Sequence, residues 1–144
     1  MTDIHIDPTR AQFDAFKALP RDQPIEMLNL VAFRRIAAYP EDHPNHAKAM
    51  TGAEAYAAYG RDSGPIFARL GGEIIWRGTM DAMLIGPQDA HWDACFIARY
   101  PNAGAFLAMV TDPDYQKAVV HRQAAVQTSR LIRCAPSSGG NGFA

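Results

Sequence analysis

The chain has 144 residues, of which 48% are hydrophobic and 20% charged, values that exclude a disordered or fibrous protein and indicate one globular domain. Its 14 basic and 15 acidic residues nearly cancel and form no basic stripe, so no nucleic-acid partner is expected. No apolar run approaches the roughly 20 residues of a membrane span, and the N-terminus lacks the apolar core of a signal peptide. We therefore expect a cytoplasmic protein with no membrane segment.

The first predicted element is a short helix that opens at Thr9 and stops at Pro20. Threonine is a good N-cap, and Phe13, Phe16 and Leu19 recur at helical spacing. This helix precedes the pattern of the main domain. The predicted organisation is a helical extension over 1–24, an α+β domain over 25–135 and a flexible tail over 136–144.

A strand is predicted over residues 25–34, which are apolar at nearly every position. Such a sequence is typical of a central strand that is covered on both faces. Alternation places Asn29 on one face among Met27, Val31 and Phe33, and places Leu28, Leu30 and Ala32 on the other. We expect the Leu/Ala face to be the packed one. Asn29 is expected to face a pocket, either in the dimer interior or at an irregularity that opens towards the helices.

Residues 35–50 show no periodicity and are predicted to form a long loop. His43 and His46 lie three apart in this loop, and both are possible zinc ligands. Two histidines in an irregular loop fix no coordination geometry, so no metal site is predicted.

A helix begins after Thr51, which starts a capping box with Glu54, and ends at Gly71-Gly72. Gly60, Gly64 and Pro65 interrupt its pattern, so a kink or break is expected near residues 60–65.

A β-hairpin follows, with an interrupted strand over 73–80 and 82–85 and its partner over 92–100. The next helix has two segments that meet at Asp112-Pro113, and the last strand covers 128–134.

Cys95 and Cys134 each lie in a predicted strand, and these strands are not neighbours in the expected sheet. Both thiols are therefore predicted to be free and buried.

The element order after the first helix is β-α-β-β-α-β. This order is typical of a ferredoxin-like α+β sandwich, with a four-stranded antiparallel sheet and both helical units on one face. The first and third strands lie at the centre of such a sheet. Because the other face needs a cover, a homodimer is predicted, with an interface on the order of 2,000 Å² or more.

Several segments together resemble an uncharacterised family called domain of unknown function 1330. They are LNLVAFR, AYAAYGRD, the GG before the second strand, WDACFIARYPNAGAFLAMVTDPDYQ and HRQAAVQTSRLIR, and they cover most of residues 25–134. The resemblance implies the dimeric α+β barrel superfamily, which includes cofactor-free monooxygenases, isomerases and haem enzymes. The family has no established reaction, so it transfers no catalytic residue to this chain.

Candidate site residues come from the elements that should line the space between sheet and helices. Asn29 interrupts an apolar strand, and its amide needs a partner from the protein or from a ligand. His121 has a side chain that accepts a proton near neutral pH, and Arg122 suits a carboxylate. Tyr59, Trp76 and Trp92 are candidates for an aromatic wall, together with Tyr56, although core packing is the commoner role for such residues.

The leading hypothesis is a small-molecule protein that acts as a cofactor-independent oxygenase or isomerase on an aromatic or enolisable substrate. In it, His121 removes a proton, Asn29 and Arg122 stabilise the resulting oxyanion, and the aromatic residues exclude water. The alternative is a non-catalytic dimeric binding or stress-associated module, in which the same residues only complete the core. A haem enzyme is a third hypothesis, ranked last, with His121 or His91 as axial ligand. The leading hypothesis needs no cofactor, and none is predicted.

Overall fold

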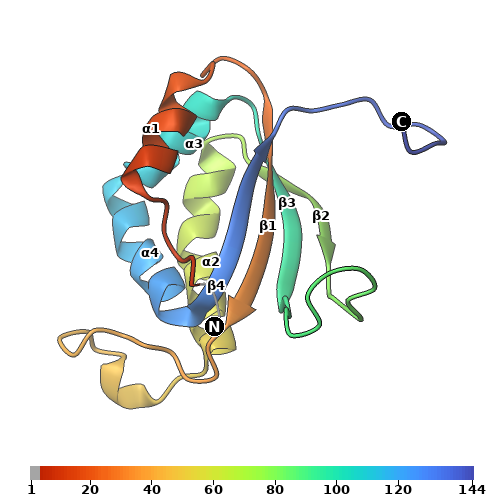
Figure 1. Ribbon diagram of the computed structural model, residues 1–144. Helices are drawn as coiled ribbons and strands as arrows, with labels where there is room; N and C mark the ends of the chain where they lie inside the picture. The colour runs from red at the N-terminus through yellow and green to blue at the C-terminus, as the bar shows by residue number, and fades with distance from the viewer. Residues whose placement is uncertain (1–3) are drawn as a thin grey trace.

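Within residues 4–144, which a computed structural model describes, four antiparallel strands form one sheet, and the helices lie on one side of it (Figure 1). A 3-10 helix, η1, follows the first strand. The elements in chain order are α1 (Arg10–Ala18), β1 (Ile25–Phe33), η1 (His46–Lys48), α2 (Gly52–Arg69), β2 (Glu73–Gly78), β3 (Ala94–Tyr100), α3 (Ala103–Val110), α4 (Pro113–Ala125) and β4 (Val126–Cys134).

The strands follow the order β2-β3-β1-β4 across the sheet, so β1 and β3 are central, as predicted. Helix α2 connects β1 to β2, and α3 with α4 connects β3 to β4, which gives two split β-α-β units. This topology is the ferredoxin-like α+β fold expected from the sequence. The additional helix α1 packs against α3 and β4, because the Phe16 ring lies 4.9 Å from that of Phe106 and 4.8 Å from the Arg133 guanidinium.

The prediction for the two faces of β1 was wrong. Ile25, Met27 and Val31 are 1%, 3% and 0% exposed and belong to the hydrophobic clusters formed with the helices. Leu28 pairs with Ile97 and Ile132 on the opposite, open face of the sheet. Both faces of the strand are apolar in sequence, so alternation alone does not show which face the helices cover.

Helix α2 is also continuous through Pro65, where a kink or break was expected. Its buried residues lie on both sides of this proline, with Ser63 before it and Ile66 after it. The first half of the helix packs in the hydrophobic cluster that contains Ala55, and the second half in the cluster that contains Ile66. This packing on both sides of Pro65 outweighs the local cost of the missing backbone donor.

The expected hairpin is shorter than predicted, because β2 ends at Gly78 and residues 79–93 form no strand. Asp93 instead joins the end of β1: its backbone N donates to Val31 O at 2.7 Å, and its carboxylate accepts from Phe33 N at 2.8 Å. The apolar residues before it are left outside the ladder, with Leu84 and Ile85 93% and 90% exposed.

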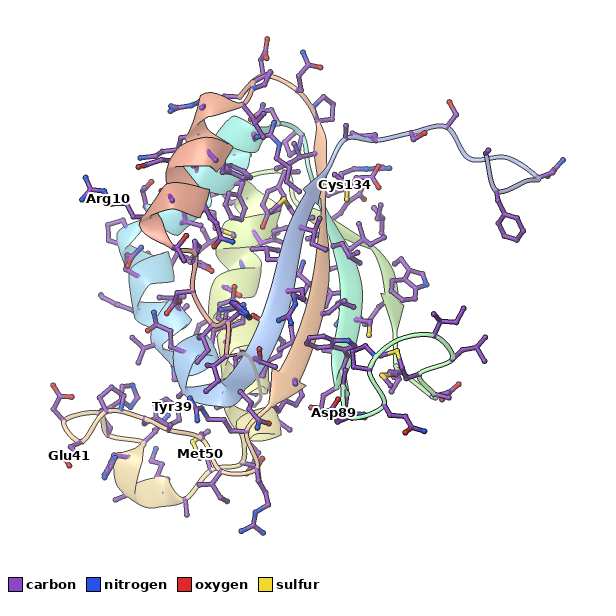
Figure 2. All side chains as sticks on the ribbon, viewed as in Figure 1. Arg10, Tyr39, Glu41, Met50, Asp89 and Cys134 are labelled. Atoms are coloured by element: carbon purple, nitrogen blue, oxygen red, sulfur yellow. The ribbon has the colours of Figure 1, made fainter. Side chains whose placement is uncertain are left out.

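Both cysteines are free, as predicted, and β1 lies between their strands. Cys95 is buried, but Cys134 is exposed. The prediction failed for Cys134 because it ends β4, an edge strand of the sheet (Figure 2).

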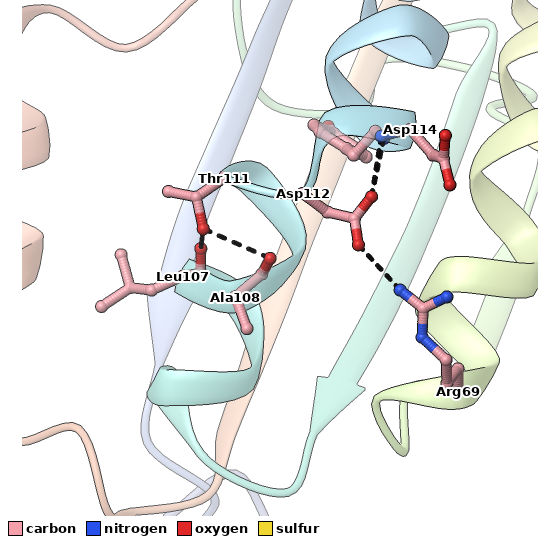
Figure 3. Close-up of polar contacts among 7 residues, drawn as sticks. Arg69, Leu107, Ala108, Thr111, Asp112 and Asp114 are labelled. Atoms are coloured by element: carbon pink, nitrogen blue, oxygen red, sulfur yellow. Dashed lines mark hydrogen bonds and ion pairs between the residues drawn. The ribbon is translucent and has the colours of Figure 1, made fainter.

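The helix ends follow the sequence signals closely. Thr9 and Thr51 each complete a capping box. Asp112 caps α4 by accepting a hydrogen bond from Asp114 N at 2.8 Å, and its other oxygen pairs with Arg69 at the end of α2, also at 2.8 Å (Figure 3). This ion pair fixes the start of α4 beside the end of α2. None of the helices in residues 4–144 is long and apolar enough to cross a bilayer.

Candidate functional site

A cavity of about 1280 Å³ lies between the helix-covered face of the sheet and helices α1, α2 and α4. Its floor includes one row of paired residues that crosses the whole sheet. The register places in this row Arg77 on β2, Phe96 on β3, Asn29 on β1 and Leu131 on β4. The strand pairing therefore fixes two polar side chains on an otherwise apolar floor.

Asn29 lies at the centre of this floor and is only partly satisfied by the protein. Its Nδ2 donates to Met27 O at 3.0 Å, while no hydrogen bond to its Oδ1 forms within residues 4–144. The side chain is half-buried and lines the cavity. An acceptor and one N–H of the amide thus remain available to a ligand.

The roof of the cavity carries tyrosines from α2 and α4. The hydroxyls of Tyr59 and Tyr115 form a hydrogen bond of 2.8 Å, which joins the two helices. Tyr56 lies one helical turn before Tyr59, and within residues 4–144 its hydroxyl forms no hydrogen bond. Burial raises the pKa of Tyr56 and of Tyr115. These hydroxyls therefore stay protonated at neutral pH, so each can donate a hydrogen bond.

Arg122 on α4 contributes a charge at one end of the cavity. Its guanidinium donates to Ile6 O at 2.5 Å and to Ser129 Oγ at 3.2 Å. Ser129 in turn donates to His5 O at 2.8 Å. These contacts hold the N-terminal segment against β4, and the acceptors of Arg122 within residues 4–144 are all neutral.

The structure brings together three of the six predicted site residues. Asn29, Tyr59 and Arg122 all line the cavity. Trp76, Trp92 and His121 do not.

Trp76 is excluded from the cavity by a β-bulge. Ile74 pairs with Ala98, but Trp76 pairs with Ile97, so Ile75 is an extra residue in β2. Since side chains alternate along a strand, this one-residue shift turns the indole to the open face, where Trp76 is 51% exposed. Trp92 is half-buried, and the Arg130 guanidinium lies 5.5 Å from its ring centre.

His121 belongs to a separate cluster where the loop after β1 meets α4. Its Nδ1 lies 2.6 Å from the Tyr39 hydroxyl, and its Nε2 lies 3.3 Å from an Asp62 carboxylate oxygen. The His43 ring stacks on that of Tyr39, with centroids 4.7 Å apart. Figure 2 shows Tyr39 below the foot of α4, in the loop that also carries Glu41 and Met50.

The loop histidines take part in protein contacts rather than facing each other as ligands. Nδ1 of His46 lies 2.9 Å from the Tyr39 carbonyl oxygen, and Nδ1 of His43 accepts from Asn45 N at 3.0 Å. In the described part of the chain, no group of three or more potential metal ligands is arranged to hold an ion.

Sequence reasoning did not select Arg77 or Tyr115 as site residues. Tyr115 precedes Arg122 by two helical turns, and helical spacing places both on one face of the helix, but Tyr115 was interpreted as part of its apolar stripe. Arg77 was harder to find, because its orientation depends on the bulge at Ile75.

Fold and cavity together define a ferredoxin-like α+β protein with a partly polar pocket that is open to solvent on one side. The family described as Domain of unknown function (DUF1330) matches residues 46–133, more than half of the chain, so the protein belongs to this family. No curated protein matches the sequence.

Several solved structures are similar to this chain. A crystal structure of a protein of unknown function from Rhodopseudomonas palustris is 57% identical, covers 95% of this chain and 100% of that one, and has a TM-score of 0.88. The methylated form of that protein gives 56% identity, 96% and 98% coverage and a TM-score of 0.89. SnoaB, a cofactor-independent oxygenase from Streptomyces nogalater, is 16% identical over 81% of this chain and 96% of that one, with a TM-score of 0.51. This last likeness shows the fold alone.

Proposed function

We propose that the chain binds a small aromatic or enolisable molecule in the cavity between sheet and helices. The observation that carries this proposal is the half-satisfied amide of Asn29 on the floor of a cavity of about 1280 Å³. Ligand pockets typically combine apolar and aromatic walls with a few polar groups that orient the ligand. Phe96 beside Asn29, with Tyr56 and Tyr59 above, provides this combination.

A catalytic role extends the proposal, and its chemistry is cofactor-independent oxygenation or isomerisation. Asn29, Arg122 and the neutral tyrosine hydroxyls suit the stabilisation of an enolate or phenolate oxygen. The proton-accepting role predicted for His121 has no geometric support, because His121 does not line the cavity. The cavity therefore supports binding and oxyanion stabilisation without a protein base. A substrate that loses its proton in solution needs no such base.

The test of binding is a thermal-shift screen with aromatic and enolisable compounds, followed by measurement of Kd. Asn29→Ala is expected to stay folded and to raise the Kd of each bound compound about tenfold, the equivalent of one lost hydrogen bond of about 1.4 kcal/mol. Asn45→Ala is the matched control, since Asn45 is half-buried outside the cavity. An unchanged Kd in Asn29→Ala, or a screen without hits, contradicts the proposal.

The same hits separate an enzyme from a non-catalytic binding module. Each is incubated with the protein without added cofactor, and oxygen consumption and product mass are followed. Turnover that exceeds the protein-free rate and falls in Asn29→Ala supports the enzyme. Tight binding with no turnover supports the alternative of a binding module.

We also propose that a second copy of the chain covers the open face of the sheet. An apolar row crosses the centre of this face and consists of Trp76, Ile97, Leu28 and Ile132. Beside it, the Arg99 guanidinium lies 3.6 Å from a Glu26 carboxylate oxygen and 3.4 Å from one of Glu73, so these charges pair within the chain and do not oppose contact with a second copy. A two-fold symmetric dimer, in which this face packs against the same face of a second copy, is the commonest kind of homo-oligomer.

Light scattering at micromolar concentration tests this interface. Trp76→Glu places a charge on the apolar row and is expected to give a folded monomer. Ile36→Glu is the control, since Ile36 is similarly exposed, 49% against 51% for Trp76, but lies in the loop after β1. A monomeric wild-type protein, or a dimeric Trp76→Glu, contradicts the proposal.

A further inference from the structure

The residues around the cavity carry an excess of positive charge. Among the described lining residues, the only acidic side chain is that of Asp7, which accepts a hydrogen bond from Gln123 Nε2 at 3.2 Å. The basic lining residues are Arg10, Arg77, Arg122, Arg130 and Arg133. Such an imbalance around a cleft favours a negatively charged ligand.

Two of these arginines, Arg77 and Arg122, have no acidic partner within residues 4–144. Arg69 and Arg99, outside the cavity, both pair with carboxylates. Within residues 4–144, neither Arg77 nor Arg122 forms an ion pair, and Arg122 donates only to a carbonyl and a hydroxyl. A guanidinium bonds carboxylates and other oxyanions most strongly, so both groups keep unused capacity for an anion.

Tyr56 and Asn29 lie between these charges. The positive charges of Arg122 and Arg77 both act on the Tyr56 hydroxyl and partly oppose the rise in its pKa that burial causes. Asn29 shares the floor row with Arg77, separated from it only by Phe96 on β3. The free hydroxyl, the free amide N–H and two guanidinium groups therefore face a common space beside an aromatic ring.

We propose that the ligand is an aromatic or enolic compound with a negatively charged oxygen, and that this oxyanion binds among Arg77, Arg122, Tyr56 and Asn29. The inference rests on the proposed small-molecule function and names the class of molecule. The aromatic part of the ligand lies against Phe96 and the tyrosines. The oxyanion supplies the negative charge that residues 4–144 do not place beside the two arginines.

The test compares aromatic carboxylates with the corresponding neutral amides of the same size. Benzoate, 2-naphthoate and anthracene-2-carboxylate, and their three amides, are titrated into the full chain, and Kd is measured by calorimetry. The carboxylates are expected to bind at least about tenfold more tightly than their amides, and their affinity falls as salt is added.

The variant of choice is Arg77→Gln, because Arg122 also holds the N-terminal segment. Arg77→Gln is expected to weaken carboxylate binding about tenfold and to leave amide binding unchanged. Arg77→Lys is expected to retain part of the preference for carboxylates over amides. Arg35→Gln is the matched control, since Arg35 is exposed and does not line the cavity.

The outcomes separate this inference from the proposed function. Equal affinity for carboxylates and amides, or equal weakening of both in Arg77→Gln, overturns the anionic ligand but leaves a small-molecule pocket. No binding by either series up to millimolar concentration overturns both. A carboxylate preference that Arg77→Gln removes and Arg35→Gln keeps establishes the site.

Discussion

The Tyr39 hydroxyl lies 2.6 Å from Nδ1 of His121, a residue 82 positions later in the chain. Asp62 on α2 lies 3.3 Å from the other ring nitrogen. One imidazole therefore connects the loop after β1, helix α4 and helix α2. Neighbouring backbone contacts strengthen this junction, with Ala38 N donating to Ala124 O at 2.8 Å.

His121 is expected to make the folded protein sensitive to acid. Burial lowers the pKa of His121 from its usual value of 6.5, and the charges of His43 and Arg61 act in the same direction, whereas Asp62 opposes them. The unfolded chain then binds this proton more readily than the folded protein. The contribution to stability is complete above about pH 6.5 and is lost as the pH falls through the lowered pKa.

The free energy of unfolding in urea, measured from pH 8 to pH 5, is the quantity that tests this expectation. His121→Gln should flatten the decrease towards acid pH. His91→Gln should not, because the His91 side chain is 64% exposed and pairs locally with Asp93. Parallel pH profiles for wild type and His121→Gln would exclude His121 as the source.

The sequence predicted the fold well because its signals are local. The N-cap at Thr9, the capping box at Thr51, the Asp112-Pro113 helix start and the element order are visible in short segments and were found in the structure. Asn29 was recognisable in the same way, as an amide within an apolar strand.

The remaining site residues depend on contacts that are distant in sequence. A single bulge at Ile75 moves Trp76 to the open face and leaves Arg77 in the cavity, and no turn or proline marks that position. His121 meets Tyr39 only because the loop after β1 folds back on α4. Neither event has a signal in short segments of the chain.

Gly52 and Gly60 lie in the same helix and are expected to respond oppositely to alanine. A Cβ at Gly52 would lie 2.0 Å from Arg34 O and 2.9 Å from Ala125 O, so the start of α2 would have to move away from the residue after β1 and from the end of α4. Gly52→Ala should lower the free energy of unfolding by about 2–4 kcal/mol. Gly60 has no atom within 4 Å of such a Cβ, so Gly60→Ala should raise stability by about 0.5–1 kcal/mol. Urea denaturation of both variants tests the contrast, which fails if both change in the same direction.

The two cysteines are expected to differ in reactivity. Cys134 is exposed and stands in a charged row beside Glu26, at the margin of the apolar open face. Cys95 is buried, and burial raises the pKa of its thiol, so little thiolate is present at neutral pH. A thiol reagent should label one site rapidly in the native protein and the second only in denaturant. Cys134→Ser should remove the rapid phase, and two rapid phases would contradict the burial of Cys95.

The Tyr59–Tyr115 hydrogen bond is expected to stabilise the protein, whereas the Tyr56 hydroxyl is expected to serve the ligand. Tyr59 and Tyr115 bond each other at 2.8 Å between α2 and α4, so either Tyr→Phe change leaves the other hydroxyl unpaired. Each single change should cost about 1–2 kcal/mol, and the double variant little more than one single.

Tyr56→Phe removes a hydroxyl that has no protein partner within residues 4–144 and should change stability by less than about 0.5 kcal/mol. It should nevertheless weaken any cavity ligand, because the proposed oxyanion loses a donor between Arg77 and Arg122. Urea denaturation and ligand titration on the same variants separate the two roles. A large loss of stability in Tyr56→Phe would show that its hydroxyl contributes to folding. Additive losses in the Tyr59→Phe, Tyr115→Phe double variant would show that the two hydroxyls do not stabilise the protein through their mutual hydrogen bond.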